Sequence, residues 1–577
     1  MKKLLVYLRP YRLQAILAPV FKLLEAAFEL LVPLIMADII DVGIAAGDTG
    51  YILKKCLLLV GLGLCGFASA TCAQYFSAKA ATGATASLRH ALFAHIQSLS
   101  YAELDTIGPA TLVTRMTSDM NQVQTGLNLT LRLLLRSPIV VFGSMIMAFT
   151  IDVRSALIFV VTIPVLFAIV FAIMLSCIPL YRRVQAKLDG VTGAAQENLS
   201  GVRVIRAFTR EQTETESFDG RLDGLFAAQR FVGKLSALLN PLTYVVINLA
   251  IVAILKTGSV RVDAGVITQG QLIALYNYMS QILVELIKFA NLILNITKSV
   301  ACAGRISQVL ETKSSMADGQ DALPDGSGSP ALQFCGVSFR YPGAEDDVLH
   351  DISFTARPGE VTAIVGSTGC GKSTLLNLIP RFYDATGGTV SIGGVNVRRL
   401  HQTDLRAMLG YVPQKGVLFT GDILSNLEFG GDVSEADAIR AAATAQAEDF
   451  IWSRPHHFLT PVAQGGANVS GGQRQRLSIA RAIARHPQVY LFDDSFSALD
   501  YQTDAALRQA LAKQTHDATV IIVAQRLSTI LHADQILVLD GGRIVGRGTH
   551  SALLRSCETY REIALSQLSA AELGEEG

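Results

Sequence analysis

The sequence has little charge, and its cysteines lack the spacing that is typical of a metal site. Only 17% of its 577 residues are charged, and a soluble protein of this size needs more charge than that to cover its surface. The eight cysteines are scattered without paired metal-ligand spacing, which is typical of apolar fillers in a reducing compartment. A net charge of +1 gives no indication of the strongly basic surface that binds nucleic acids. Lipid-facing surface is the simplest explanation for this composition.

Long apolar stretches recur through the first 310 residues. Half of all residues are hydrophobic, and the mean hydropathy is +0.38. Each stretch is long enough to cross a hydrocarbon core of ~30 Å, which takes about 20 helical residues. The sequence therefore predicts a multidomain membrane protein that begins with an all-α transmembrane domain over residues 1–311. Its six expected spans are 14–44, 52–79, 129–151, 155–181, 236–258 and 268–298.

The connections between these spans alternate between short and long. The stretch from Tyr181 through Lys234 contains nine Lys and Arg residues, so the positive-inside rule places the long connections and the N-terminus in the cytoplasm. Lys54 and Lys55 are a small contrary signal near the outer face. The long connections keep helical spacing, which predicts membrane helices that continue into the cytoplasm. The basic start of the chain has no small-residue cleavage site and predicts a retained cytoplasmic lead-in helix.

Charged residues also occur inside the expected spans. Lys22, Glu25 and Glu29 share roughly one face of the first span, and Glu285 lies three residues before Lys288 in the sixth. An intramembrane charge commonly faces a cavity and is functional. The alternative is that these side chains reach the interface or pair with one another. We expect the alternative for Lys22 and Lys288 and keep Glu29 as a candidate for a cavity site.

A change of composition separates a second domain. Residues 312–330 are rich in Gly, Ser, Pro and Asp and predict a linker. Residues 331–568 alternate strand-like apolar runs with helical segments and predict an α/β domain, and residues 569–577 form an acidic tail.

A strand in the second domain runs directly into a glycine-rich loop. EVTAIVG continues into GSTGCGKST, which matches the phosphate-binding loop pattern. The glycines let backbone N–H groups surround phosphates, Lys372 reaches the terminal phosphates, and the Ser373 hydroxyl can ligate Mg²⁺. A lone match can arise by chance, but the strand, loop and helix are in the expected order. The expected ATP-binding residues of this loop are Gly366, Ser367, Thr368, Gly369, Cys370, Gly371, Lys372, Ser373 and Thr374, with Cys370 a tolerated small residue.

Two acidic residues end another apolar run, VYLFDD. In enzymes with a phosphate-binding loop, Asp493 at this place holds Mg²⁺ directly or through water. The alternative is a buried strand that ends in a capping Asp, which is plausible only if the phosphate-binding loop is disregarded. We therefore expect ATP and Mg²⁺ as the cofactors of this domain.

The segment VSGGQRQRLSIARAIAR identifies the family that this chain resembles. Ser470, Gly471, Gly472 and Gln473 lead a helix and resemble the Leu-Ser-Gly-Gly-Gln signature of the ATP-binding cassette (ABC) family. The resemblance implies that two nucleotide domains pair head to tail, with each ATP between one domain's phosphate loop and the other's signature. A Ser-Gly-Gly turn that opens a helix offers N–H donors to a γ-phosphate.

Other landmarks of the family follow in order, and the resemblance covers nearly the whole chain. Tyr341 resembles the aromatic residue that stacks on adenine. Gln414 resembles the glutamine that contacts Mg²⁺ and responds to the membrane domain, and Ser497–Asp500 resembles the loop that crosses the dimer interface. Six spans with two long cytoplasmic connections resemble an exporter-type membrane domain. ENLSGVRVIRAF and GPATLVTRMTSDM resemble its coupling regions, whose tips dock on the nucleotide domains.

The sequence departs from the family pattern at two catalytic positions. The acid after the Mg²⁺ aspartate is normally Glu, which deprotonates the attacking water, and here it is the shorter Asp494. The switch histidine is replaced by Gln525, which can donate a hydrogen bond to a phosphate but cannot carry a proton. An error near 1 Å in a catalytic group can cost about 100-fold in rate. Val469 and Gln464 are lesser departures, the first in the signature and the second in a loop thought to contact the coupling regions.

These residues predict an exporter subunit whose own ATP site is catalytically impaired. The leading hypothesis is ATP-driven export of amphipathic drugs or lipids across the inner (plasma) membrane by a heterodimer, in which a sibling chain supplies the competent glutamate and histidine. One alternative is a homodimer in which Asp494 is a slower base. Another is a regulatory or channel-like protein that ATP gates without net pumping. The peptide-exporting branch is disfavoured because no cysteine protease domain fits before the first span. Expected partners are a second half-transporter, the substrate and the lipid bilayer, with no nucleic acid.

Overall fold

The computed structural model describes residues 2–322 and 331–568, and the predicted acidic tail lies outside this range. The chain divides into two compact units. The first contains Met1–Gln97 and Pro109–Thr312, and the second contains Ser98–Gly108 and Lys313–Gly577. A short segment from the membrane half, Ser98–Gly108, therefore groups with the nucleotide domain, which matters for the site below.

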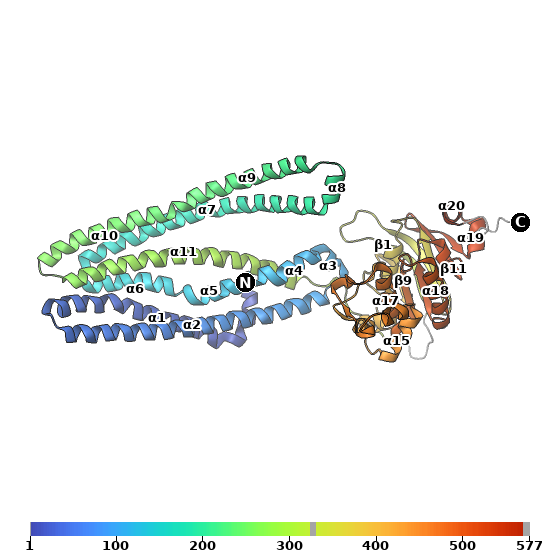
Figure 1. Ribbon diagram of the computed structural model, residues 1–577, viewed down its shortest axis with the longest axis horizontal. Helices are drawn as coiled ribbons and strands as arrows, with labels where there is room; N and C mark the ends of the chain where they lie inside the picture. The colour runs from blue at the N-terminus through green and yellow to red at the C-terminus, as the bar shows by residue number, and fades with distance from the viewer. Residues whose placement is uncertain (1, 323–330, 569–577) are drawn as a thin grey trace. The chain divides into compact units, whose positions relative to one another are not determined.

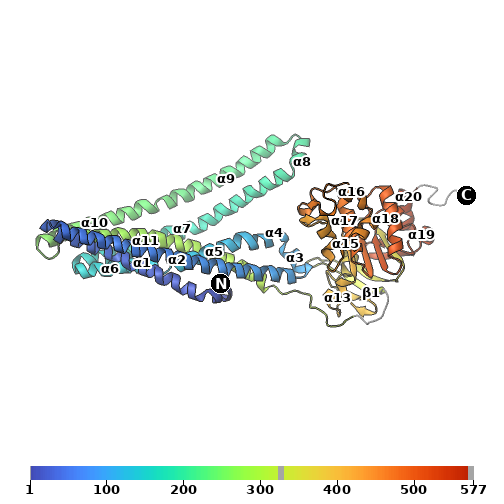
Figure 2. The ribbon, with the colours of Figure 1, turned by 60° about the horizontal axis from the view of Figure 1, so that its bottom comes forward.

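The first unit is entirely helical, as the sequence predicts (Figure 1). Its elements are η1 (Lys2–Tyr11), α1 (Arg12–Asp38), η2 (Ile39–Ile44), α2 (Thr49–Ser98), α4 (Pro109–Thr114), η3 (Arg115–Asp119), α5 (Met120–Leu133), α6 (Arg136–Ile151), α7 (Val153–Ser200), α8 (Val202–Ala207), α9 (Glu211–Ala237), α10 (Leu239–Asp263) and α11 (Gln269–Glu311). Helix α7 packs along α9 and α10, and Figures 1 and 2 both show these helices side by side.

Five stretches of helix in the described residues are long and apolar enough to cross a membrane, against six expected spans. The first expected span does form a helix, α1, of 27 residues. Every 18-residue stretch of α1 contains Lys22, Glu25 and Glu29, because these three lie near its middle. The first expected span is therefore absent from the five because of its charged residues, although its helix is long enough.

The membrane helices are much longer than a bilayer requires. Helix α2 has 50 residues and α7 has 48, more than twice the roughly 20 that span the hydrocarbon core. This confirms the prediction that the helices continue beyond the membrane. The short connection between α6 and α7 is a single residue, Asp152, whose side chain accepts a hydrogen bond from the Ser155 N–H at 2.9 Å. Asp152 thus follows the last residue of α6 and caps the N-terminus of α7, so that no loop separates the two helices.

The charged residues inside the bundle form one network across α1, α6 and α11. The Arg136 guanidinium donates hydrogen bonds to Glu285 and, at 2.6 Å, to Glu29. Glu285 also accepts from Lys288 at 2.9 Å, the pair that the sequence predicts. Lys22 is buried and pairs with Glu25, which is one of the two outcomes expected for it. Three cations and three carboxylates thus neutralise one another inside the bundle.

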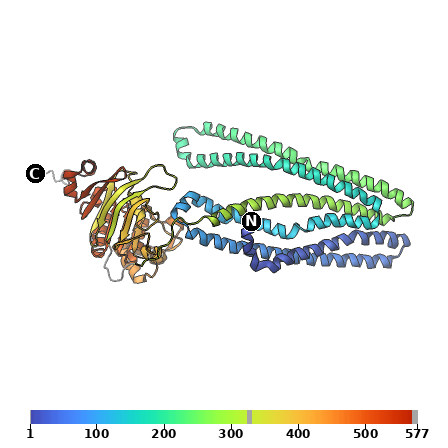
Figure 3. The same ribbon diagram turned by 180° about the vertical axis from the view of Figure 1, so that it is seen from behind.

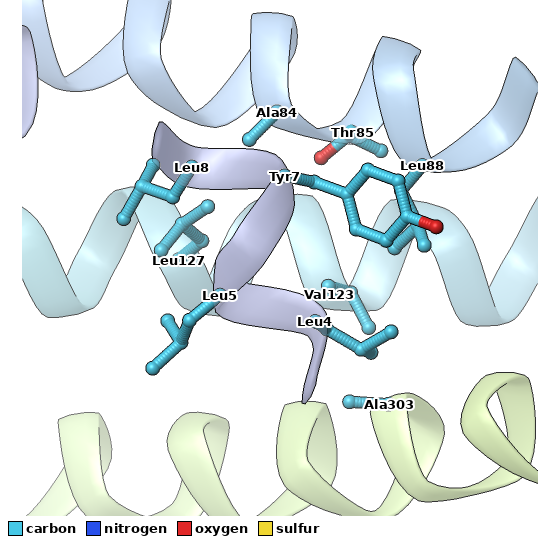
Figure 4. A pocket seen from close by; sticks show the side chains of 10 residues that line it. All are labelled: Leu4, Leu5, Tyr7, Leu8, Ala84, Thr85, Leu88, Val123, Leu127 and Ala303. Atoms are coloured by element: carbon cyan, nitrogen blue, oxygen red, sulfur yellow. The ribbon is translucent and has the colours of Figure 1, made fainter. Parts of the chain in front are cut away.

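The N-terminal segment packs against the helices instead of extending away from them. It forms a 3₁₀ helix, η1. Figure 4 shows its leucines turned toward residues of three helices around a cavity of about 40 Å³. The lining residues are Leu4, Leu5, Tyr7 and Leu8 of η1, Ala84, Thr85 and Leu88 of α2, Val123 and Leu127 of α5, and Ala303 of α11. Tyr11 lies over Gly83, where an added Cβ would come within 2.2 Å of its ring.

The second unit is an α/β domain built on two sheets. A mostly parallel six-stranded sheet has the order β12-β11-β3-β10-β9-β6, and an antiparallel sheet has the order β2-β1-β4-β5. The strands are β1 (Leu332–Phe339), β2 (Leu349–Ala356), β3 (Val361–Gly366), β4 (Gly387–Ile392), β5 (Val395–Asn396), β6 (Leu409–Val412), β7 (Gly421–Asp422), β8 (Pro461–Val462), β9 (Val489–Asp493), β10 (Thr519–Val523), β11 (Gln535–Asp540) and β12 (Arg543–Gly548). Figure 3 shows the antiparallel strands in yellow.

The helices of the second unit are short compared with those of the first. They are α3 (Tyr101–Ile107), α12 (Lys372–Leu378), α13 (Gln402–Ala407), α14 (Ile423–Leu427), α15 (Glu435–Thr444), α16 (Glu448–Trp452), α17 (Gly471–Ala484), α18 (Tyr501–Gln514), α19 (His550–Ser556) and α20 (Glu558–Gln567). Both faces of the larger sheet are covered, since Val489 and Leu491 of β9 join one apolar core while Tyr490 and Phe492 join another. This fixed sheet positions the loops at its strand ends.

Candidate functional site

The phosphate-binding loop follows β3 and has a backbone that only glycine allows. Gly366 has a φ of 156°, and a Cβ there would lie 2.0 Å from the Leu539 carbonyl oxygen. Gly371 has a φ of 101°, and its added Cβ would meet the Leu349 side chain at 2.7 Å. Both glycines are therefore required by geometry. Lys372 Nζ donates to the carbonyl oxygens of Gly366 and Ser367 at 2.8 and 2.7 Å, so the lysine lies over its own loop.

Oxygen atoms suited to Mg²⁺ meet beside this loop. Ser373 Oγ donates to Asp493 Oδ1 at 2.9 Å, and Asp493 ends the buried strand β9. Burial, and after it the neighbouring Asp494 charge, raise the pKa of Asp493 above its usual value. A hydroxyl and one carboxylate fit Mg²⁺, which takes few protein oxygens and completes its shell with phosphates and water. The described residues contain no cluster of three or more His, Cys, Asp or Glu able to hold a metal alone.

The residue that follows, Asp494, is buried and has a strained backbone. Its φ of 45° lies in the left-handed region, and its N–H donates to the Val523 carbonyl oxygen at 2.9 Å. Gln414 Nε2 donates to Asp494 Oδ2 at 3.3 Å, so these two expected site residues do meet. Gln525, beyond the end of β10, is exposed, and its carbonyl oxygen accepts a hydrogen bond from Gln567. The Gln525 side chain therefore stays open to solvent on this unit.

The expected signature residues start helix α17. Ser470 Oγ caps the helix by accepting from the Gln473 N–H at 3.3 Å, and the Ser470 N–H donates to Gln473 Oε1 in return. Ser470 and Gly471 are exposed, and a Cβ added to Gly471 would have nothing within 4 Å. A helix of 14 residues thus presents its N-terminus at an open surface. Its N–H groups and dipole can bind an anion that arrives from another molecule.

The aromatic residue Tyr341 lies next to the phosphate-binding loop. The Tyr341 hydroxyl lies 3.0 Å from Thr374 Oγ1, so the aromatic residue touches the last residue of the loop. Its ring packs edge-on against Phe339 and Tyr383, with centroids 4.8 and 5.3 Å away. The structure thus brings together the loop, Tyr341, Asp493, Asp494 and Gln414.

Comparison with known proteins agrees with this arrangement along the whole chain. The family model of the ABC transporter transmembrane region matches residues 15–286, and the ABC transporter model matches residues 349–497. An uncharacterized ABC transporter ATP-binding protein of Mycobacterium tuberculosis (strain CDC 1551 / Oshkosh) is 39% identical over 573 residues, covering 98% of both chains. The chain belongs to the ABC transporter family.

Other relatives extend the comparison. The uncharacterized ABC transporter ATP-binding protein YfiB of Bacillus subtilis (strain 168) is 36% identical, and the putative multidrug export ATP-binding/permease protein YgaD of the same organism is 30% identical. Each match covers 98% of both chains. A solved bacterial Atm1-family ABC exporter with ATP bound is 26% identical, with a TM-score of 0.80 over 97% of this chain and 98% of that one.

Membership of this family establishes the general activity of the chain. It is a membrane protein of the exporter fold that binds ATP, couples ATPase activity to transport and functions as a dimer. Sequence reasoning missed Arg136, the centre of the intramembrane network, and Tyr383, which connects Tyr341 to α3. The sequence motif RFYD contains Tyr383, but its contacts lie with residues far away in the chain.

Proposed function

We propose that this ABC exporter chain is the subunit of a heterodimer that carries an impaired ATP site. The observation that carries the proposal is the pair of residues at the hydrolytic positions, Asp494 and Gln525. Asp494 has a backbone in the left-handed region and accepts a hydrogen bond from Gln414, and its side chain is one methylene shorter than that of glutamate. Gln525 can donate a hydrogen bond to a phosphate oxygen but cannot shuttle a proton.

In this proposal the chain's own loop binds ATP and its signature serves the other site. Lys372 and the loop N–H groups would hold the phosphates, Ser373, Gln414 and Asp493 would hold Mg²⁺, and Tyr341 would stack on adenine. The exposed N-terminus of α17 would close on ATP bound to the partner chain, which would supply the competent glutamate. The partner is thus a different half-transporter, and the nucleotide domain lies in the cytoplasm below the inner (plasma) membrane.

The proposed substrates are amphipathic small molecules. The first unit contains an apolar cavity of about 180 Å³ between α6, α7 and α11, lined mainly by aliphatic side chains and by Phe142, Phe167 and Phe289. A cavity with few polar anchors accepts many amphipathic compounds. The relative named as a putative multidrug exporter supports the same class.

Accumulation in sealed vesicles tests the transport itself. Inside-out vesicles that contain this chain and its partner are given a fluorescent amphipathic dye and either ATP or a non-hydrolysable ATP analogue. We expect dye accumulation above the equilibrium level with ATP only. Equilibration without accumulation under ATP would instead favour the alternative of an ATP-gated, channel-like protein.

A further inference from the structure

Helix α11 has a polar face within its apolar span. The spacing of the polar residues on this face places them on one side of a helix with 3.6 residues per turn. None of them is fully buried, so this face is open to a molecule beside the helix. Polar residues inside a membrane span commonly serve a function, because burial in hydrocarbon is costly for them. The residues of this polar face are Asn277, Gln281, Lys288, Asn291 and Asn295.

Two buried polar atoms on or beside the polar face have no hydrogen-bond partner within residues 2–322 and 331–568. They are Gln281 Oε1 and Arg136 Nε, and the Arg136 side chain as a whole is more than nine-tenths buried. Arg136 lies beside the polar face because it donates to Glu285, three residues before Lys288. A buried donor or acceptor without a partner costs free energy, so the two atoms indicate a site that a ligand completes.

The charged network at this place offers a ligand one group of each sign. The Glu29 side chain is 39% exposed and that of Lys288 is 47% exposed, whereas Arg136 and Glu285 are buried. Across the described part of the chain, Glu29 accepts one hydrogen bond, at Oε2, and the Lys288 ammonium donates one, to Glu285. One carboxylate oxygen and two N–H groups therefore remain for a ligand.

The network is neutral as a whole, with three cations and three carboxylates. In a medium of low dielectric constant an added unpaired charge is costly, whereas a ligand with one charge of each sign keeps the site neutral. Glu29 and Lys288 are connected through Arg136 and Glu285 by consecutive hydrogen bonds of 2.6, 2.5 and 2.9 Å. The two open groups therefore lie close enough together for one head group to contact both.

We propose that Glu29 and Lys288 bind the head group of a zwitterionic amphipathic substrate. The ammonium of the substrate pairs with Glu29, its anionic group pairs with Lys288, and Gln281 Oε1 accepts a further hydrogen bond from the head group. Arg136 and Glu285 position the two binding residues. This inference names the substrate class of the proposed transport and rests on that proposal, because it requires the membrane unit to bind amphipathic molecules.

Binding of three matched probes to the assembled transporter, in a nonionic detergent and without nucleotide, tests the site. The probes share one fluorescent amphipathic body, and their head groups carry an ammonium, a sulfonate, or both. Fluorescence anisotropy gives the affinity of each probe. We expect the wild type to bind the zwitterionic probe at least about tenfold more tightly than either of the others, the effect of one charge-assisted hydrogen bond.

Two single substitutions should change the preferred head group in opposite directions. Glu29→Gln makes the network positive and should favour the sulfonate probe, whereas Lys288→Gln makes it negative and should favour the ammonium probe. Each should weaken binding of the zwitterionic probe by about tenfold. Both variants should fold, because Gln at position 29 still accepts from Arg136, and Glu285 keeps Arg136 and Ser137 without Lys288. The double variant is neutral again and should bind the three probes about equally.

The matched controls are Lys298→Gln on the same helix and Glu197→Gln on α7, which remove exposed charges outside the network. Both should keep the order of affinities of the wild type. The proposal is overturned if the wild type binds no probe or prefers a singly charged one, if the two single variants change preference in the same direction, or if the controls behave like them. Because binding is measured without ATP, a failure here leaves the dye accumulation in vesicles and the turnover of either ATP site unaffected, and the converse also holds.

Discussion

Gly471→Asp should lower ATP hydrolysis by the assembled transporter by about 100-fold or more, the cost of losing preorganised donors at a reacting phosphate. Gly471 is the first residue of α17, is exposed, and has space for a side chain. A carboxylate at this place is favourable for the helix alone, so the chain is expected to fold normally. In the proposed assembly the same carboxylate would take the position of a phosphate bound to the partner chain and repel it.

Two comparisons make this prediction specific. Gly471→Asn has nearly the same size without the charge and should lose much less activity. Asp494→Asn alters the chain's own site, and we expect it to cost less than about threefold because, in the proposed function, that site contributes little turnover. Equal, large losses for Gly471→Asp and Asp494→Asn would favour the homodimer with a slower base.

Arg136→Met should destabilise the membrane unit by about 3–5 kcal/mol, the typical cost of removing one partner from a buried ion pair. The Arg136 side chain is only 7% exposed, and its loss leaves Glu285, itself 3% exposed, without its guanidinium. Lys288 still bonds to Glu285 but is half-exposed and cannot replace contacts on α1. The melting temperature of the purified transporter in lipid nanodiscs measures the effect.

The matched control is Arg154→Met, which removes an exposed arginine from the start of α7. It should leave the melting temperature nearly unchanged. Arg136→Met combined with Glu285→Met should recover part of the loss, because an apolar pair leaves no unpaired carboxylate at that place. If Arg136→Met melts like Arg154→Met, the network does not stabilise the bundle.

The sequence predicts best what depends on local pattern. The phosphate loop could be located because glycines at positions such as Gly366 and Gly371 are required by backbone geometry. The membrane helices could be located because apolar length is itself the physical requirement for crossing a bilayer. The strands β9 and β10 were readable for a similar reason, since a parallel strand buried on both faces is a continuous apolar run.

The contacts that the sequence did not predict join residues that are far apart in the chain. Arg136 pairs with Glu29 and Glu285, 107 and 149 residues away, and Tyr383 bonds to Asp105, 278 residues away. No local pattern specifies such partners. For Lys22 the sequence left two outcomes open, a side chain that reaches the interface or one that pairs with a neighbour. In the structure Lys22 pairs with Glu25, three residues along the same helix.

The most direct test of the proposal that this chain's ATP site is impaired is the turnover of that site in isolation from the partner's site. The transporter is assembled with a partner chain whose catalytic glutamate is replaced by Gln, so that remaining hydrolysis reports on the site of this chain. We expect very slow steady-state hydrolysis, and an increase of about tenfold or more when Asp494→Glu and Gln525→His are introduced together. Brisk hydrolysis by the unmodified site, or no gain from the two substitutions, would contradict the account.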